Sequence, residues 1–233
     1  MEMDEGTLER ETKREHFEIV VEQCQRMADI IGHLRIFGRR DALEPSLMDP
    51  STCVRRAVEI AKKHGVDIIH KPCRAADVWE HGGGVPLAKR PLPRQEYRLV
   101  ELKRWSDHLG IPINLHPKYF PADETLAART IIAVQDDGKD VSDLTETLMG
   151  DIWLRERDIS LPATVREALV SNGLSTEYLE NADLPAIANI YDANCQSARD
   201  RNIFGVPTYF VGNEMFWGQD RLDFVERAVA QNI

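Results

Sequence analysis

The chain has 233 residues, 42% of them hydrophobic, so it is long enough to bury a full core and form one domain. Its formal net charge of -10 argues against nucleic acid or an anionic membrane surface as main partner, because phosphate contacts need clustered lysines and arginines. The apolar runs are too short to span a bilayer and residues 1–15 are mostly charged, unlike a signal peptide, so we expect a soluble cytoplasmic protein.

The N-terminal region predicts one long amphipathic helix, from Thr7 to about Ile36. Its apolar residues recur at spacings of three and four, with charged and amide residues opposite them. Such a stripe must be covered by its own domain or by a partner, and a homodimer is one possibility. The stretch Gly38–Pro50 then indicates an irregular connection. We therefore predict an N-terminal segment of residues 1–50 and a main domain of residues 51–233.

A second helix is expected from Ser51 or Thr52 to Lys63. The preceding Asp49 and Pro50 are typical of a helix start, and a glycine after His64 is typical of a helix end. The β-branched run that follows, Val66–His70, predicts a short strand.

The cysteines argue against two kinds of site. They lack the close pairing that a structural zinc site or a dithiol oxidant needs, so we expect no metal. The four are Cys24, Cys53, Cys73 and Cys195. The glycine-rich stretch 81–91 lacks the spacing of a nucleotide-binding loop. Its two basic residues, Lys89 and Arg90, are either a solvated face or an anion-binding pair.

Helical periodicity dominates the middle of the chain. Apolar residues at helical spacing, separated by glycine, proline and asparagine, predict a series of helices with no internal repeat. The expected ranges are Tyr97–Leu109, Thr125–Gln135, Val141–Arg155, Ala163–Asn172, Thr176–Ala182 and Leu184–Arg201.

The C-terminal stretch predicts a hairpin that leads into a helix. Gly212 and Asn213 stand between two short apolar runs and tolerate the positive φ of a tight turn. Leu222–Val229 then has helical spacing. Pro207 opens the first strand, where a proline marks an edge, a turn or a cis peptide.

The residues around this hairpin resemble a known family. Gly205–Thr208, followed by the run Met215–Glu226, is similar to the 2-hydroxychromene-2-carboxylate isomerases, relatives of the kappa-class glutathione transferases and of the disulfide oxidoreductase DsbA. The resemblance extends over about Thr52–Ala230. It implies an α/β, thioredoxin-like fold with a large all-helical insertion at about 87–202, here preceded by the extra N-terminal helix. It also implies that Pro207 is cis.

The resemblance implies a glutathione-dependent isomerase that acts on a small aromatic-derived carboxylate, an intermediate of aromatic degradation. The thiolate of glutathione would add to the substrate, allow bond rotation and then leave. The backbone of Val206, beside Pro207, would pair with the cysteinyl backbone of glutathione. Asp220 and Arg221, with Gln219 at the same helix start, would hold its γ-glutamyl end.

The chain departs from the family at the residue that faces the glutathione sulfur. The family's Ser-Pro-Tyr-Ser-Tyr-Leu motif is missing, and the nearest substitutes are Ser51, Thr52 and Cys53. We predict Ser51 as the catalytic, thiol-activating residue, although each of the three has the alternative role of capping the helix or, for Cys53, of a thiol with a lowered pKa. The family's first strand is also missing, and residues 33–37 are the nearby candidate for it, in competition with the N-terminal helix.

Two alternatives to the isomerase remain: a different enzyme with the same fold, and a protein without catalytic activity. A kappa-like glutathione transferase or thiol oxidoreductase has the same fold, but the missing Cys-x-x-Cys argues against an oxidoreductase, and the run Trp217–Arg221 favours the isomerase branch. The other alternative is a divergent, non-catalytic member whose N-terminal helix mediates assembly.

Overall fold

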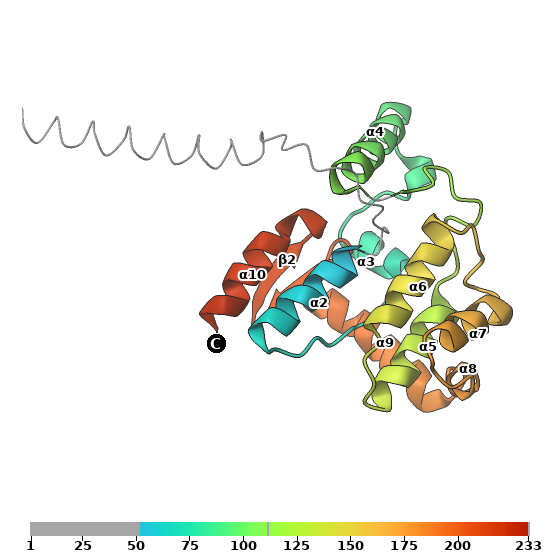
Figure 1. Ribbon diagram of the computed structural model, residues 1–233. Helices are drawn as coiled ribbons and strands as arrows, with labels where there is room; N and C mark the ends of the chain where they lie inside the picture. Colours follow the sequence, from blue (N-terminus) through green and yellow to red (C-terminus); the bar gives the residue numbers. More distant parts are fainter. Residues whose placement is uncertain (1–51, 111, 233) are drawn as a thin grey trace, which may run out of the picture. The chain divides into compact units, whose positions relative to one another are not determined.

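The computed structural model describes residues 52–110 and 112–232, and within them it shows a largely helical α/β structure with one small sheet (Figure 1). The helices are α2 (Thr52–His64), α3 (Ala75–His81), η1 (Leu87–Lys89), α4 (Leu92–Leu109), α5 (Thr125–Asp136), α6 (Ser142–Trp153), α7 (Pro162–Ser171), α8 (Glu177–Asn181), α9 (Pro185–Asp200), η2 (Gln219–Arg221) and α10 (Leu222–Gln231). The strands are β1 (Thr208–Val211) and β2 (Glu214–Trp217).

The two strands form the antiparallel hairpin that the sequence predicts. Thr208 lies opposite Trp217 and Val211 lies opposite Glu214. The turn falls at Gly212, whose φ of 58° lies in the left-handed region that glycine adopts at low cost.

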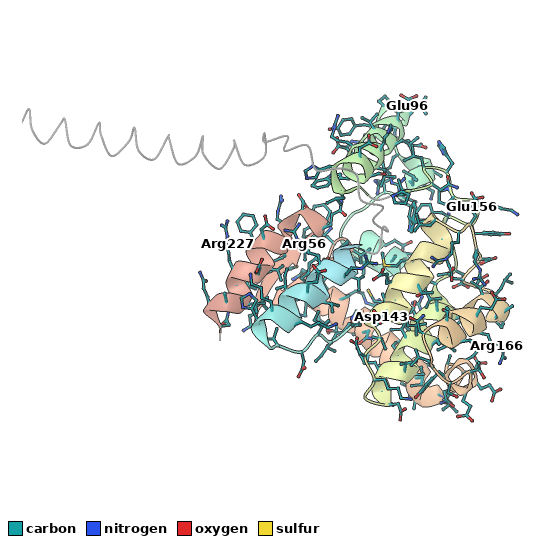
Figure 2. All side chains as sticks on the ribbon, viewed as in Figure 1. Arg56, Glu96, Asp143, Glu156, Arg166 and Arg227 are labelled. Atoms are coloured by element: carbon teal, nitrogen blue, oxygen red, sulfur yellow. The ribbon has the colours of Figure 1, made fainter. Side chains whose placement is uncertain are left out.

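The hairpin, α2 and α10 share one small hydrophobic core. Phe216 of β2 is buried between apolar side chains of the two helices, including Ile60 of α2 and Val225 of α10. Figure 1 shows α2 and α10 beside the hairpin. Arg56, which Figure 2 labels on α2, forms an ion pair of 2.5 Å with Asp223 of α10. The core therefore joins the start of the described chain to its C-terminal end.

The helices between the two halves of this small core have a larger core of their own. α5 lies at its centre and packs against α9, α8, α7 and α6. The side chains of Ile132, Leu144, Leu169 and Tyr191 are almost completely buried there. The periodicity predicted these five helices to within about two residues at each end, because a buried apolar stripe is visible in the sequence.

The predicted strand at Val66–His70 is wrong for the structure, which has an irregular segment there. A strand requires a backbone ladder with a neighbouring strand. The segment instead uses a side chain: the amide of Gln135 on α5 makes two hydrogen bonds of 2.9 Å with the backbone N–H and C=O of His70. Two apolar residues of the segment, Ile68 and Ile69, are exposed rather than buried in the core.

The helices before α5 agree only in part with those predicted from the sequence. α2 begins at Thr52 and ends before Gly65, whose φ is 65°, so the predicted helix is confirmed. α4 begins at Leu92 rather than Tyr97, because the two prolines beside Leu92 suit the first turn of a helix. The short helix α3 was not predicted. The N-terminal helix, the candidate strand at residues 33–37 and the division at residue 50 lie outside the described residues.

Candidate functional site

The Val206–Pro207 junction lies at the start of the hairpin. The peptide bond is cis, as the sequence predicts. Val206 is exposed, and neither its N–H nor its C=O makes a hydrogen bond within the described part of the chain. A backbone with a free donor and a free acceptor can pair with an extended peptide, as an additional strand would.

A backbone hydrogen bond brings the start of the last helix to this junction. The N–H of Gly218 donates to the C=O of Pro207 over 3.0 Å. Gly218 has a φ of 99°, and a Cβ at this position would lie 2.6 Å from an Oδ atom of Asp220. Only glycine therefore fits the bend that places η2 next to Val206.

The predicted γ-glutamyl residues lie together in η2. The guanidinium of Arg221 donates to the carboxylate of Asp220 over 2.6 Å, and the two side chains are 46% and 38% exposed. An exposed pair of this kind contributes little to stability. Both groups remain accessible, so they could bind an ammonium and a carboxylate of one ligand. Gln219 is half-buried at the start of the same turn.

Two aromatic side chains lie close to the junction. Phe204 and Trp217 meet edge to face with ring centroids 4.9 Å apart, and both are substantially exposed. Gly205 lies against the indole, so closely that a Cβ would stand 2.3 Å from its nitrogen. Gly82, after α3, approaches Phe204 just as closely, at 2.5 Å from its Cβ. The glycine-rich stretch is therefore part of this site's surroundings.

Ser51, the predicted thiol-activating residue, comes immediately before the first described residue. Ser51 lies outside the described residues, and α2 begins at the next residue, Thr52. The first turn of α2 carries no acidic residue, and its last turn carries three basic ones, Lys62, Lys63 and His64. The N-terminus of a helix favours negative charge, and nothing in its first turn opposes a thiolate.

The two cysteines whose side chains are described are not candidates for a nucleophile. Burial is the main cause that raises the pKa of the Cys73 thiol to about 11, and the nearby Cys195, Glu124 and Asp77 contribute to the same rise. Cys195 is fully buried and its sulfur accepts a hydrogen bond of 3.2 Å from the backbone of Arg74. Both positions suit packing rather than thiolate chemistry.

The site residues predicted from the sequence form one part of this candidate site, and the aromatic part was not predicted. The resemblance assigned five residues to one site, and the hairpin and η2 bring them close together: Val206, Pro207, Gln219, Asp220 and Arg221. Phe204, Gly205 and Gly82 were not among the predicted site residues, and their contacts depend on the tertiary fold. The signal that could have found Gly205 is a glycine immediately before the Val-Pro pair.

Comparison with known proteins places the chain in a family. Residues 52–230 match the model of the DSBA-like thioredoxin domain. A 2-hydroxychromene-2-carboxylate isomerase of Pseudomonas sp. (strain C18) is 31% identical over 75% of this chain and 81% of its own length. One of Pseudomonas putida is 30% identical over 76% of this chain and 86% of its own length. The chain belongs to this family of isomerases.

A solved structure supports the same assignment. A 2-hydroxychromene-2-carboxylate isomerase superposes with a TM-score of 0.58 at 28% identity and covers 78% of this chain and 89% of its own. The family resemblance, the thioredoxin-like α/β fold and the isomerase class predicted from the sequence are thereby confirmed. None of the helices in residues 52–110 and 112–232 combines the length and apolar character needed to cross a membrane.

Proposed function

We propose that this isomerase acts on a 2-hydroxychromene-2-carboxylate-type intermediate of aromatic degradation and depends on glutathione. The relatives' names support the substrate class. The observation that carries the glutathione assignment is the Val206 backbone, exposed and free of hydrogen bonds, beside the accessible pair of Asp220 and Arg221. Glutathione has a peptide backbone that can pair with Val206. Its γ-glutamyl end carries an ammonium and a carboxylate group that can pair with Asp220 and Arg221.

The residues present fit glutathione in two places. The N–H and C=O of Val206 would pair with the cysteinyl backbone, as strands pair. Arg221 would bind the γ-glutamyl carboxylate, and Asp220 would bind the ammonium group. Gln219 would lie at the edge of this pocket. Because Arg221 and Asp220 already hold each other within 2.6 Å, little side-chain ordering is needed when the ligand binds.

Bound glutathione would supply a thiolate nucleophile, which permits rotation about a double bond by addition and elimination. The chain's own contribution would be to hold the sulfur and favour its charged form. We assign this role to the N-terminus of α2, with Ser51 as hydrogen-bond donor and Thr52 and Cys53 as rivals. A donated hydrogen bond and the partial positive charge of the helix end both lower a thiol's pKa.

The proposal is tested by measuring conversion of 2-hydroxychromene-2-carboxylate by the full chain with and without glutathione. We expect turnover that rises with glutathione and saturates. Equal rates with and without it would remove glutathione from the mechanism. Covalent transfer of glutathione to a substrate, rather than isomerisation, would favour the kappa-like transferase alternative.

A further inference from the structure

A cavity of about 270 Å³ lies between α4, η1 and the segment that follows α4. None of the 18 residues of α4 is fully buried. Apolar side chains form much of the cavity wall, and three polar side chains reach it. Those that matter here are Gln95, Arg98, Leu99, Leu115, His116 and Phe120. Its volume is near the lower end for ligand pockets and suits one small ring compound.

Arg98 is the unusual member of this wall. Its guanidinium lies 5.5 Å from the ring centroid of Phe120 and 5.9 Å from that of Trp153, whose rings are themselves in contact. Two aromatic faces therefore hold the side chain in place. The guanidinium is positioned before any ligand arrives, which reduces the entropy cost of binding.

This guanidinium has no acidic partner within residues 52–110 and 112–232. On the same helix, Lys103 pairs with Asp107 and Arg104 pairs with Glu101. Burial lowers the pKa of Arg98, and the charged neighbour that contributes is another cation, Arg90. Glu156 receives a hydrogen bond from Asn114, and Glu96 is exposed on α4 (Figure 2). A partly desolvated cation beside a second cation favours an anion.

We propose that this cavity binds a small aromatic carboxylate, with Arg98 pairing with the carboxylate and the ring lying against Leu99, Leu115 and Phe120. A planar guanidinium binds a carboxylate through two parallel hydrogen bonds, which a lysine cannot do. The inference rests on the proposed function in one respect, since the natural ligand is then the isomerase's substrate. The cavity is close in sequence to the proposed glutathione site. Leu87 in its wall comes five residues after Gly82, which lies against Phe204 of that site.

The test is calorimetric titration of the full chain, without glutathione, using benzoate and benzyl alcohol as probes. The two probes share a ring and differ in the carboxylate. We compare the wild type with Arg98→Gln and with the matched control Arg94→Gln, which removes an exposed arginine from the same helix. A third variant, Leu115→Trp, fills the cavity and keeps Arg98.

We expect the wild type to bind benzoate more tightly than benzyl alcohol. Arg98→Gln should lose roughly tenfold or more in benzoate affinity, the value of a charged hydrogen bond, and keep its affinity for the alcohol. Arg94→Gln should match the wild type, and Leu115→Trp should weaken both probes. The inference is overturned if the wild type does not bind benzoate, if Arg98→Gln behaves like Arg94→Gln, or if Arg98→Gln weakens both probes equally.

The same measurements separate this inference from the proposed function. Benzoate binding that needs Arg98, in a chain whose turnover does not respond to glutathione, supports the cavity and contradicts the glutathione mechanism. Glutathione-dependent turnover with benzoate binding unaffected by Arg98→Gln contradicts the cavity and supports the mechanism.

Discussion

Gln135 pairs its side-chain amide with both backbone polar groups of His70. The N–H of His70 donates to Oε1, and Nε2 donates to the C=O of His70, each over 2.9 Å. The side chain thus makes the two hydrogen bonds that a neighbouring strand would otherwise make. The irregular segment after α2 is fixed in this way to α5, the helix at the centre of the larger core.

Replacing Gln135 with leucine should lower the free energy of unfolding by roughly 1–3 kcal/mol, because two backbone groups of half-buried His70 lose their partners. Urea denaturation measures the change. Gln196→Leu is the matched control, since it removes hydrogen bonds that Gln196 makes at the exposed surface of α9. Equal losses in the two variants would show that the contact with His70 has no special value.

Gly205→Ala should destabilise the hairpin by roughly 1–3 kcal/mol, because the new methyl group must displace the indole of Trp217. The displacement should also change the tryptophan fluorescence of the folded protein. In a Trp217→Ala background the same substitution should cost much less. A cost that is the same in both backgrounds would mean that the indole is not the obstacle.

The stability of the protein should fall as the pH drops below 6.5, partly through His70. Burial lowers the pKa of its imidazole from the ordinary value of 6.5, while Asp140 acts in the opposite direction. The ring also lies 3.3 Å from the hydroxyl of Ser142. In this pH range the unfolded state binds more protons than the folded state, so acid favours unfolding.

His70→Gln should make the unfolding free energy less dependent on pH in this range. The measurement is urea denaturation at about pH 7.5 and about pH 5.5, where carboxylates of ordinary pKa stay ionised. His108→Gln, at an exposed histidine on α4, serves as control and should keep the wild-type slope. A His70→Gln protein with the wild-type slope would exclude this histidine as the cause.

Asp220→Ala should weaken glutathione binding by roughly tenfold or more and leave kcat almost unchanged. The contact to the γ-glutamyl end is made equally before and during the reaction, so its loss raises KM for glutathione alone. Glu214→Ala, which removes an exposed carboxylate from β2, is the control. If Asp220→Ala binds glutathione as tightly as Glu214→Ala does, the assignment of the γ-glutamyl site is wrong.

Local chemistry determined much of what could be predicted from the sequence alone. The apolar stripe of α5, the end of α2 at Gly65 and the turn at Gly212 depend on residues close together in the chain. The family resemblance assigned Val206 and the pair in η2 to one site, and their closeness is local because they flank one hairpin.

The tertiary structure decided the features that depend on distant partners. Val66–His70 has the composition of a strand, yet the side chain of Gln135 on α5 takes the place of a neighbouring strand. The periodicity of α4 indicates a packed helix. Its spacing says nothing about a cavity beside it, or about an arginine that has no acidic partner among the described residues. Residue patterns report which face of an element is apolar, whereas only long-range packing determines what that face meets.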